Sequence, residues 1–268
     1  MKLGLVTYNL AKDWDVDQLI NMCAEHGFRG VELRTTHAHG VEVDLSKDER
    51  KEVRRKFEDS PVELAGLGSA FEFHSDSPEE LRRNIDGTKE YCRLAADVDA
   101  PGVKVRPNGL LVEKGVPEEK TLRQIGESLA ECGEFAAALD VQIRLEVHGS
   151  ETKDPVRIRR ILNYADHPNV YVCWNSNAYE VEGGSIRGNF QLLQEAIALV
   201  HMRDLCTEDY PWVELLRLLR RNGYSGFCLA EIPASDQPGR IMDYYRSLWD
   251  AYHRILDLEG VASGVHCA

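Results

Sequence analysis

Residues 141–149 have the sequence VQIRLEVHG, which is typical of a buried β-strand yet carries three ionisable side chains. Alternate side chains of a strand point to the same side, so Arg144, Glu146 and His148 share one face while apolar residues form the other. Burying ionisable groups is unfavourable unless they are paired with opposite charges or bind a metal. The polar face therefore belongs either to an internal ion-pair network or to a functional site.

The same pattern recurs in two later strand-like segments. Residues 200–204, VHMRD, contain His201, and residues 229–232, LAEI, contain Glu231. In each segment a potential metal ligand stands near the C-terminal end of the apolar run. Three such segments in one chain indicate a shared site.

Outward from these segments, strands and helices alternate along the whole chain. We expect strands at 2–8, 28–34, 62–69, 102–107, 141–149, 169–174, 199–203 and 227–232. Helices are expected at 14–26, after the capping residue Ser46, and at 77–98, 117–139, 154–167, 189–197, 212–222 and 240–258. This pattern predicts one (β/α)8 TIM barrel over residues 1–259, followed by a frayed C-terminal tail at 260–268. An open doubly wound sheet is disfavoured, because no glycine-rich phosphate loop follows the first strand.

In such a barrel the active site lies at the C-terminal ends of the strands, where Glu146, His201 and Glu231 would converge. Carboxylates and an imidazole suit one divalent ion such as Mn²⁺, Mg²⁺, Co²⁺ or Zn²⁺. The sixth strand would supply Asn175, whose neutral amide oxygen binds metal more weakly than a carboxylate. The alternative is that the two glutamates pair with arginines at the barrel mouth, such as Arg106.

Composition excludes several classes of function. Asp and Glu number 45 against 32 Lys and Arg, and the resulting net charge of −13 repels nucleic acid. No apolar run approaches the ~20 residues of a membrane span. The seven cysteines form no CxxC pair, which favours free thiols in a reducing, cytoplasmic setting. The aromatic side chains of the last predicted helix suit barrel packing, which we favour, or a homo-oligomer contact.

Five segments in this order resemble the xylose isomerase-like TIM-barrel superfamily of sugar-phosphate isomerases and epimerases. They are GVELR at 30–34, LEVH at 145–148, CWN at 173–175, VHMRD at 200–204 and LAEI at 229–232. The resemblance implies that Glu146 and Glu231 bind a divalent metal and exchange the substrate proton, with His201 as the metal histidine. The superfamily ordinarily has an aspartate where this chain has Asn175.

We therefore predict a metal-dependent isomerase or epimerase that acts on a small sugar or keto-polyol through an enediolate. Residues expected to contact this substrate are His148, Arg203, Arg106, His74 and Trp174. For His74 simple surface exposure is an equally good interpretation, and for Trp174 ordinary packing is. Two alternatives stay open: a keto-polyol dehydratase, and a non-catalytic sugar-binding barrel, which Asn175 makes plausible.

Overall fold

The computed structural model describes the backbone of residues 1–264 and the side chains of residues 1–259. Within this range, eight parallel strands close into a barrel in sequence order. They are β1 (Lys2–Val6), β2 (Gly30–Arg34), β3 (Glu63–Glu72), β4 (Gly102–Arg106), β5 (Gln142–Glu146), β6 (Val170–Asn175), β7 (Ile197–Met202) and β8 (Phe227–Ala230). The predicted (β/α)8 TIM barrel is confirmed.

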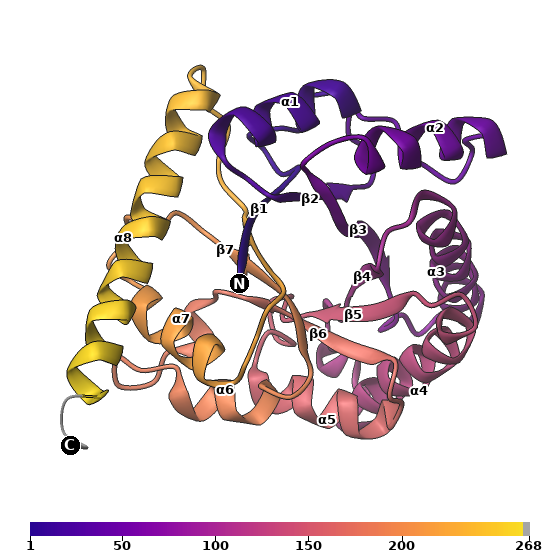
Figure 1. The fold of residues 1–268 in the computed structure, drawn as a ribbon. Helices are drawn as coiled ribbons and strands as arrows, with labels where there is room; N and C mark the ends of the chain where they lie inside the picture. Colours follow the sequence, from indigo (N-terminus) through magenta and orange to yellow (C-terminus); the bar gives the residue numbers. More distant parts are fainter. Residues whose placement is uncertain (265–268) are drawn as a thin grey trace.

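Eight α-helices surround the barrel within the same range, and the barrel closes because β8 pairs with β1 (Figure 1). The helices are α1 (Val16–His26), α2 (Lys47–Glu58), α3 (Pro78–Val98), α4 (Glu118–Ala137), α5 (Pro155–Ala165), α6 (Arg187–Leu193), α7 (Trp212–Arg221) and α8 (Pro238–Gly264). Two short 3₁₀ helices, η1 (Val112–Lys114) and η2 (Ala178–Glu180), lie in the loops that follow β4 and β6.

Local signals explain where several helices begin. Ser46 caps α2, as expected, and forms a reciprocal capping box with Glu49. Ser77 caps α3 and Asp154 caps α5, and in both helices a proline occupies the first turn, where its missing N–H costs no hydrogen bond.

Two predicted boundaries differ from the structure. The helix expected at 189–197 is α6, which ends at Leu193, because Ile197 already pairs with Val172 at the start of β7. The register of a parallel strand thus overrides the helical pattern at that point. The tail expected at 260–268 overlaps α8, which extends to Gly264, and residues 265–268 lie outside the described residues.

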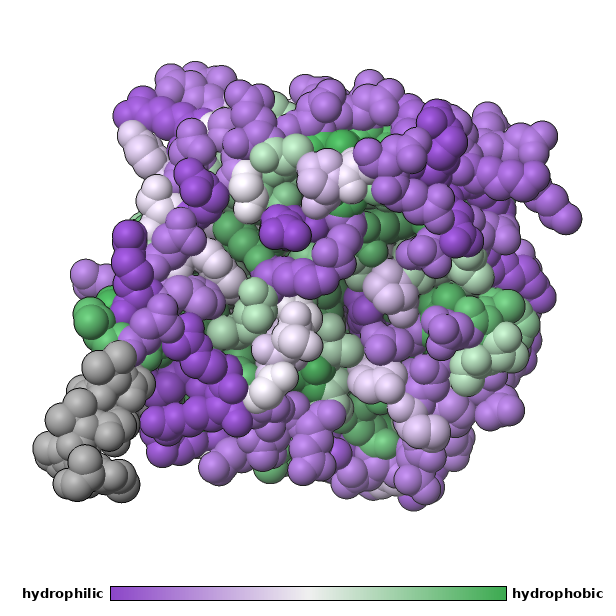
Figure 2. All heavy atoms as spheres, in the orientation of Figure 1, coloured by the Kyte–Doolittle hydropathy of each residue, from purple (hydrophilic) through white to green (hydrophobic). Residues whose placement is uncertain are grey.

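The main hydrophobic core fills the space between the sheet and the helices, whereas the barrel interior is largely polar. Among the described residues, a second and smaller apolar cluster, which includes Val6, Cys173 and Leu229, lies inside it. Most of the surface in Figure 2 is hydrophilic, in keeping with the net charge of −13. No helix among the described residues is both long enough and apolar enough to cross a membrane.

Glycines in the strands leave room for the buried charges. A side-chain carbon at Gly68 would lie 2.8 Å from Oε1 of Glu32, and one at Gly102 would lie 2.5 Å from Nε of Arg144. Both charged side chains are buried inside the barrel. Only glycine, which has no side chain, therefore leaves room at these two positions for the buried charged groups.

Candidate active site and metal centre

Strand register brings the predicted ligands to one level of the barrel. Asn175 is the pairing partner of His201 across β6 and β7, and the backbone N–H of Glu231 donates to the carbonyl of Met202 at 2.8 Å. Glu146 ends β5 opposite Cys173. All four predicted ligands therefore stand at the C-terminal ends of adjacent strands, where the side chains can meet.

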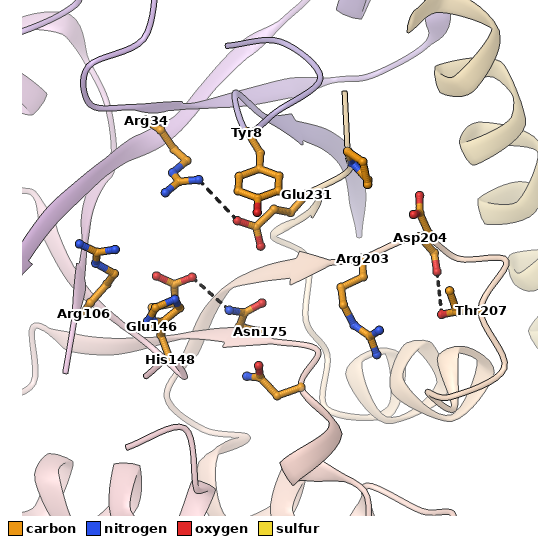
Figure 3. A pocket seen from close by; sticks show the side chains of 12 residues that line it. Tyr8, Arg34, Arg106, Glu146, His148, Asn175, Arg203, Asp204, Thr207 and Glu231 are labelled. Carbon is orange, nitrogen blue, oxygen red and sulfur yellow. Dashed lines mark hydrogen bonds and ion pairs between the residues drawn. The ribbon is translucent and has the colours of Figure 1, made fainter. Parts of the chain in front are cut away.

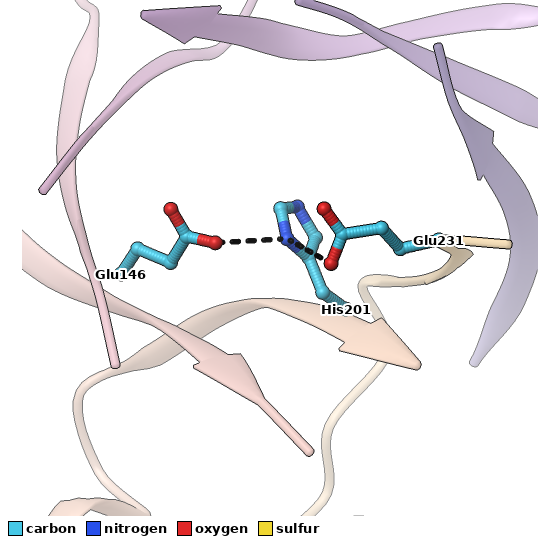
Figure 4. A group of neighbouring side chains, drawn as sticks. All are labelled: Glu146, His201 and Glu231. Atoms are coloured by element: carbon cyan, nitrogen blue, oxygen red, sulfur yellow. Dashed lines mark ion pairs between the residues drawn. The ribbon is translucent and has the colours of Figure 1, made fainter. Parts of the chain in front are cut away.

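Glu146, His201 and Glu231 form a compact triad. One ligand atom from each lies within 4.8 Å of the others. Nδ1 of His201 lies 3.6 Å from Oε1 of Glu146 and 3.9 Å from Oε2 of Glu231, so both carboxylates face the same ring nitrogen (Figure 4). That nitrogen is buried and has no hydrogen-bond partner. Two carboxylates around an unpartnered imidazole nitrogen form a donor set that suits a divalent cation.

The opposite nitrogen of the same imidazole faces Glu32. Nε2 of His201 lies 3.2 Å from Oε1 of Glu32, and both side chains are essentially inaccessible. Burial is the largest influence and would raise the pKa of Glu32, but the charge and close contact of His201 together with the charge of Lys104 outweigh it, so the pKa is lowered. A carboxylate beside Nε2 holds a proton on that nitrogen, so a metal ion that displaced the other proton would find the lone pair of Nδ1 available. Glu32 thus lies beside a histidine, in a position where no periodicity of the sequence indicates its partner.

Glu146 has two further partners. Nζ of Lys104, on β4, donates to Oε2 at 2.7 Å, and the amide Nδ2 of Asn175 donates to Oε1 at 3.1 Å. Although burial would raise the pKa of Glu146, the charge of Lys104 is the largest influence that lowers it, and the pKa falls well below its usual range. The internal ion-pair network considered from sequence is thus partly realised, with a lysine in place of an arginine.

Glu231 differs from Glu146 in its electrostatic surroundings. Besides His201, it has Arg34 nearby, whose Nη1 lies 3.9 Å from Oε1, and its side chain is 18% exposed. Burial raises its pKa, and the negative charge of Glu146 adds to that rise despite opposing cations. The two glutamates therefore have pKa values displaced in opposite directions.

A pocket of about 470 Å³ opens above the triad (Figure 3). Of the residues predicted to bind substrate, His148, Arg106 and Arg203 line it. Its other lining residues are Tyr8, Arg34, Glu146, Asn175, Asn177, Asp204, Thr207, Glu231 and Pro233.

Two predicted substrate contacts are not among the lining residues. Trp174 is fully buried on the outer face of β6, where its Nε1 donates to the hydroxyl of Tyr210 at 2.9 Å and its ring packs edge-on against Phe190. Alternation explains this: Trp174 points away from the face that carries Asn175. His74 lies next to Gly109, where a side-chain carbon would be 3.2 Å from its Cδ2.

Sequence reasoning did not assign Tyr8, Arg34, Lys104, Asp204 or Thr207 to the site. For Lys104 a signal exists, because it alternates with Arg106 in the strand sequence GVKVR, so both residues share the inner face. Asp204 and Thr207 lie in the loop after β7. Loops have no hydrophobic periodicity, so the sequence does not indicate where these two side chains point.

Comparisons with known proteins agree with this fold. Residues 20–248 match the model of the xylose isomerase-like TIM barrel family, and the chain belongs to that family. No curated protein matches the sequence.

Several solved structures are similar to the chain at low sequence identity. A structure of L-ribulose 3-epimerase has a TM-score of 0.83 and 12% identity, and it covers 100% of this chain and 99% of that one. D-Psicose 3-epimerase from Clostridium cellulolyticum H10 has a TM-score of 0.78 and 17% identity, and the match covers 96% of this chain and 99% of that one. The IolI protein with a bound zinc atom has a TM-score of 0.74 and 17% identity, and the match covers 94% of this chain and 96% of that one. At these identities the similarity establishes the fold.

Proposed function

We propose that the chain is a divalent-metal-dependent isomerase or epimerase that acts on a small sugar or keto-polyol. The observation that carries the proposal is the pair of carboxylates, Glu146 and Glu231, on either side of Nδ1 of His201 at the floor of a polar pocket. The epimerase activity of structural relatives and the zinc atom in the IolI protein support it.

Glu146, His201 and Glu231 would hold the metal ion. Oε1 of Glu146 is its available donor, because Oε2 is occupied by Lys104. An amide oxygen from Asn175 can join only if the amide rotates, since its nitrogen now faces Glu146. A divalent ion bound there would polarise a substrate carbonyl and so acidify the adjacent C–H.

The raised pKa of Glu231 favours it as the residue that takes the proton from carbon, since a base works best when its pKa approaches the working pH. Glu146 stays ionised beside Lys104 and holds negative charge against the metal. Return of the proton by Glu231 to the neighbouring carbon of the enediolate would give an isomer. Protonation of the original carbon from the opposite face would give an epimer, and Glu146 would deliver that proton after taking one up from solvent, because it is otherwise ionised.

Deuterium incorporation from heavy water tests the proposal. The Mn²⁺-loaded protein is incubated with small ketoses, and NMR follows exchange of hydrogen on the carbon next to the carbonyl. Glu231→Gln and Glu146→Gln should abolish exchange while circular dichroism shows an intact fold, and Glu127→Gln, at an exposed position of α4, is the matched control.

The outcomes separate the alternatives. Exchange that survives both active-site changes contradicts the assigned roles. A product that has lost water identifies a dehydratase. Ketose binding without exchange in the parent protein supports the sugar-binding alternative.

A further inference from the structure

Three arginines line the pocket, and they differ in how their charges are balanced. Nη1 of Arg203 lies 2.9 Å from Oδ2 of Asp209 and its Nε donates to the carbonyl of Ser176 at 2.8 Å, so a carboxylate already compensates its charge. Within the described part of the chain, the one ion pair of Arg34 is a long 3.9 Å approach to Glu231. For Arg106 no ion pair occurs among the residues that the structure describes.

Arg106 is held in place without being neutralised. Its Nη2 donates to the carbonyl of Ala70 at 3.1 Å, and its Nε is buried without a hydrogen-bond partner. The acidic residue beside it in the sheet register, Glu72, accepts a hydrogen bond from Asn108 instead. A guanidinium that is positioned by a neutral carbonyl retains its full positive charge for a ligand.

Arg34 and Arg106 lie on the same side of the pocket, and Arg203 lies on the other side (Figure 3). Arg34 ends β2 and Arg106 ends β4, so both project from strand ends toward the space above the triad. His148 stands beside them, with Nδ1 2.7 Å from Oδ1 of Asn108. One side of the pocket is thus cationic in a chain whose net charge is −13.

We propose that the substrate carries an anionic group, a carboxylate or a phosphate, which Arg106 and Arg34 bind while its keto-alcohol end faces the triad. The inference rests on the proposed function, for which it names the substrate class. Guanidinium groups match carboxylate and phosphate oxygens in geometry as well as charge, whereas a neutral sugar would leave the charge of Arg106 uncompensated in the pocket.

A matched series of three-carbon ketones tests the substrate class. Dihydroxyacetone, hydroxypyruvate and dihydroxyacetone phosphate share the HOCH2–C=O unit and differ only at the other end, which is neutral, a carboxylate or a phosphate. For each compound, kcat/KM for deuterium exchange is measured with the Mn²⁺-loaded protein. We expect an anionic compound to exceed the neutral one by at least about tenfold, the size of one charge-assisted hydrogen bond. The better of the two anions identifies the group.

Variants connect this preference to the arginine. Arg106→Gln should lower the ratio of anionic to neutral kcat/KM by about tenfold, mainly through KM, and Arg106→Lys should restore part of it. Arg83→Gln, on the exposed side of α3, is the control and should leave the ratio unchanged. Equal kcat/KM for all three compounds, or an unchanged ratio in Arg106→Gln, would overturn the inference while leaving the proposed function standing.

A second measurement is independent of catalysis. If none of the compounds exchanges, isothermal titration with inorganic phosphate and with lactate still decides whether the pocket binds anions. Binding to the parent that is lost in Arg106→Gln supports the anion site even though the proposed reaction has failed for this series. Absent binding, or equal binding to parent and variant, overturns the anion site.

Discussion

Nζ of Lys104 lies 2.7 Å from Oε2 of Glu146, and both side chains are almost completely buried at the base of the pocket. This ammonium neutralises one of the two carboxylates that face Nδ1 of His201. Asn175 stands where the family resemblance leads us to expect another carboxylate. Compared with that expectation, the site has one negative charge fewer, and Lys104 holds the Glu146 oxygen that points away from the triad.

Lys104→Gln should destabilise the metal-free protein and make metal more stabilising. Removing one partner of a buried ion pair typically costs about 3–5 kcal/mol, because the other charge is left uncompensated. A divalent ion would replace that compensation, so the increase in Tm on adding Mn²⁺ should be larger than in the parent. Thermal unfolding with and without Mn²⁺ measures both effects.

Lys2→Gln is the control, since it removes an exposed ion pair with Glu63. Such pairs contribute about 0–1 kcal/mol, so this variant should differ little from the parent. An unchanged metal response in Lys104→Gln would show that Lys104 does not influence the triad.

Asn175→Asp should tighten metal binding. An aspartate adds a charged oxygen at the level of the triad, and we expect Kd for Mn²⁺ to fall at least about tenfold, which corresponds to ~1.4 kcal/mol. Isothermal titration of metal-free protein gives Kd, and elemental analysis of protein purified without chelator gives the metal content.

Asn177→Asp provides the matched comparison, because Nδ2 of Asn177 donates to the carbonyl of Val147 at 2.6 Å and the amide is committed to the backbone. If both variants tightened binding equally, general charge rather than coordination by residue 175 would be responsible.

Glu32→Gln should weaken metal binding although Glu32 is not among the triad residues. Its carboxylate lies 3.2 Å from Nε2 of His201 and sets the ring's orientation and tautomer. Loss of such a partner commonly reduces metal affinity about 10- to 100-fold. Titration with Zn²⁺ or Mn²⁺ measures the change, and Glu63→Gln, an exposed glutamate on β3, serves as the control. Equal affinity in Glu32→Gln and the parent would contradict the role of Glu32.

Glu180 should make stability depend on pH. Burial raises the pKa of Glu180 to about 8, so the folded protein keeps a proton there that the unfolded chain releases above its ordinary pKa of 4.5. The folded state therefore binds more protons between these values, and the contribution of this group to stability falls as pH rises from about 4.5 to about 8. The full effect is on the order of 5 kcal/mol.

Glu180→Gln cannot release this proton and should lose that part of the pH dependence. Urea unfolding of parent and variant at pH 5 and pH 8 gives the difference in unfolding free energy. Relative to the parent, the variant should become more stable at the higher pH. A constant difference would show that Glu180 titrates normally.

The fold and the triad could be predicted because each rests on short-range periodicity. Alternation places Glu146, His201 and Glu231 inside, and parallel connectivity carries their strand ends to one rim. The pairing of Lys104 with Glu146 requires the register between β4 and β5, which sequence alone does not specify. The same limit applies to Glu32, whose partner His201 is five strands away along the chain and lies across the barrel.

Arg144 extends this arrangement to the far end of the barrel. Its guanidinium occupies the space that Gly102 leaves open, and its Nη1 donates to the carbonyl of Ala65 at 2.7 Å. Burial lowers its pKa, which the charge of Glu32 partly opposes, and Glu32 in turn faces His201. A series of charge interactions, from Arg144 to Glu32 and from Glu32 to His201, therefore runs along the barrel axis. Because Arg144 does not line the pocket, substitutions there should change metal affinity through Glu32 and His201 without changing the pocket's lining, so the two properties can be selected separately.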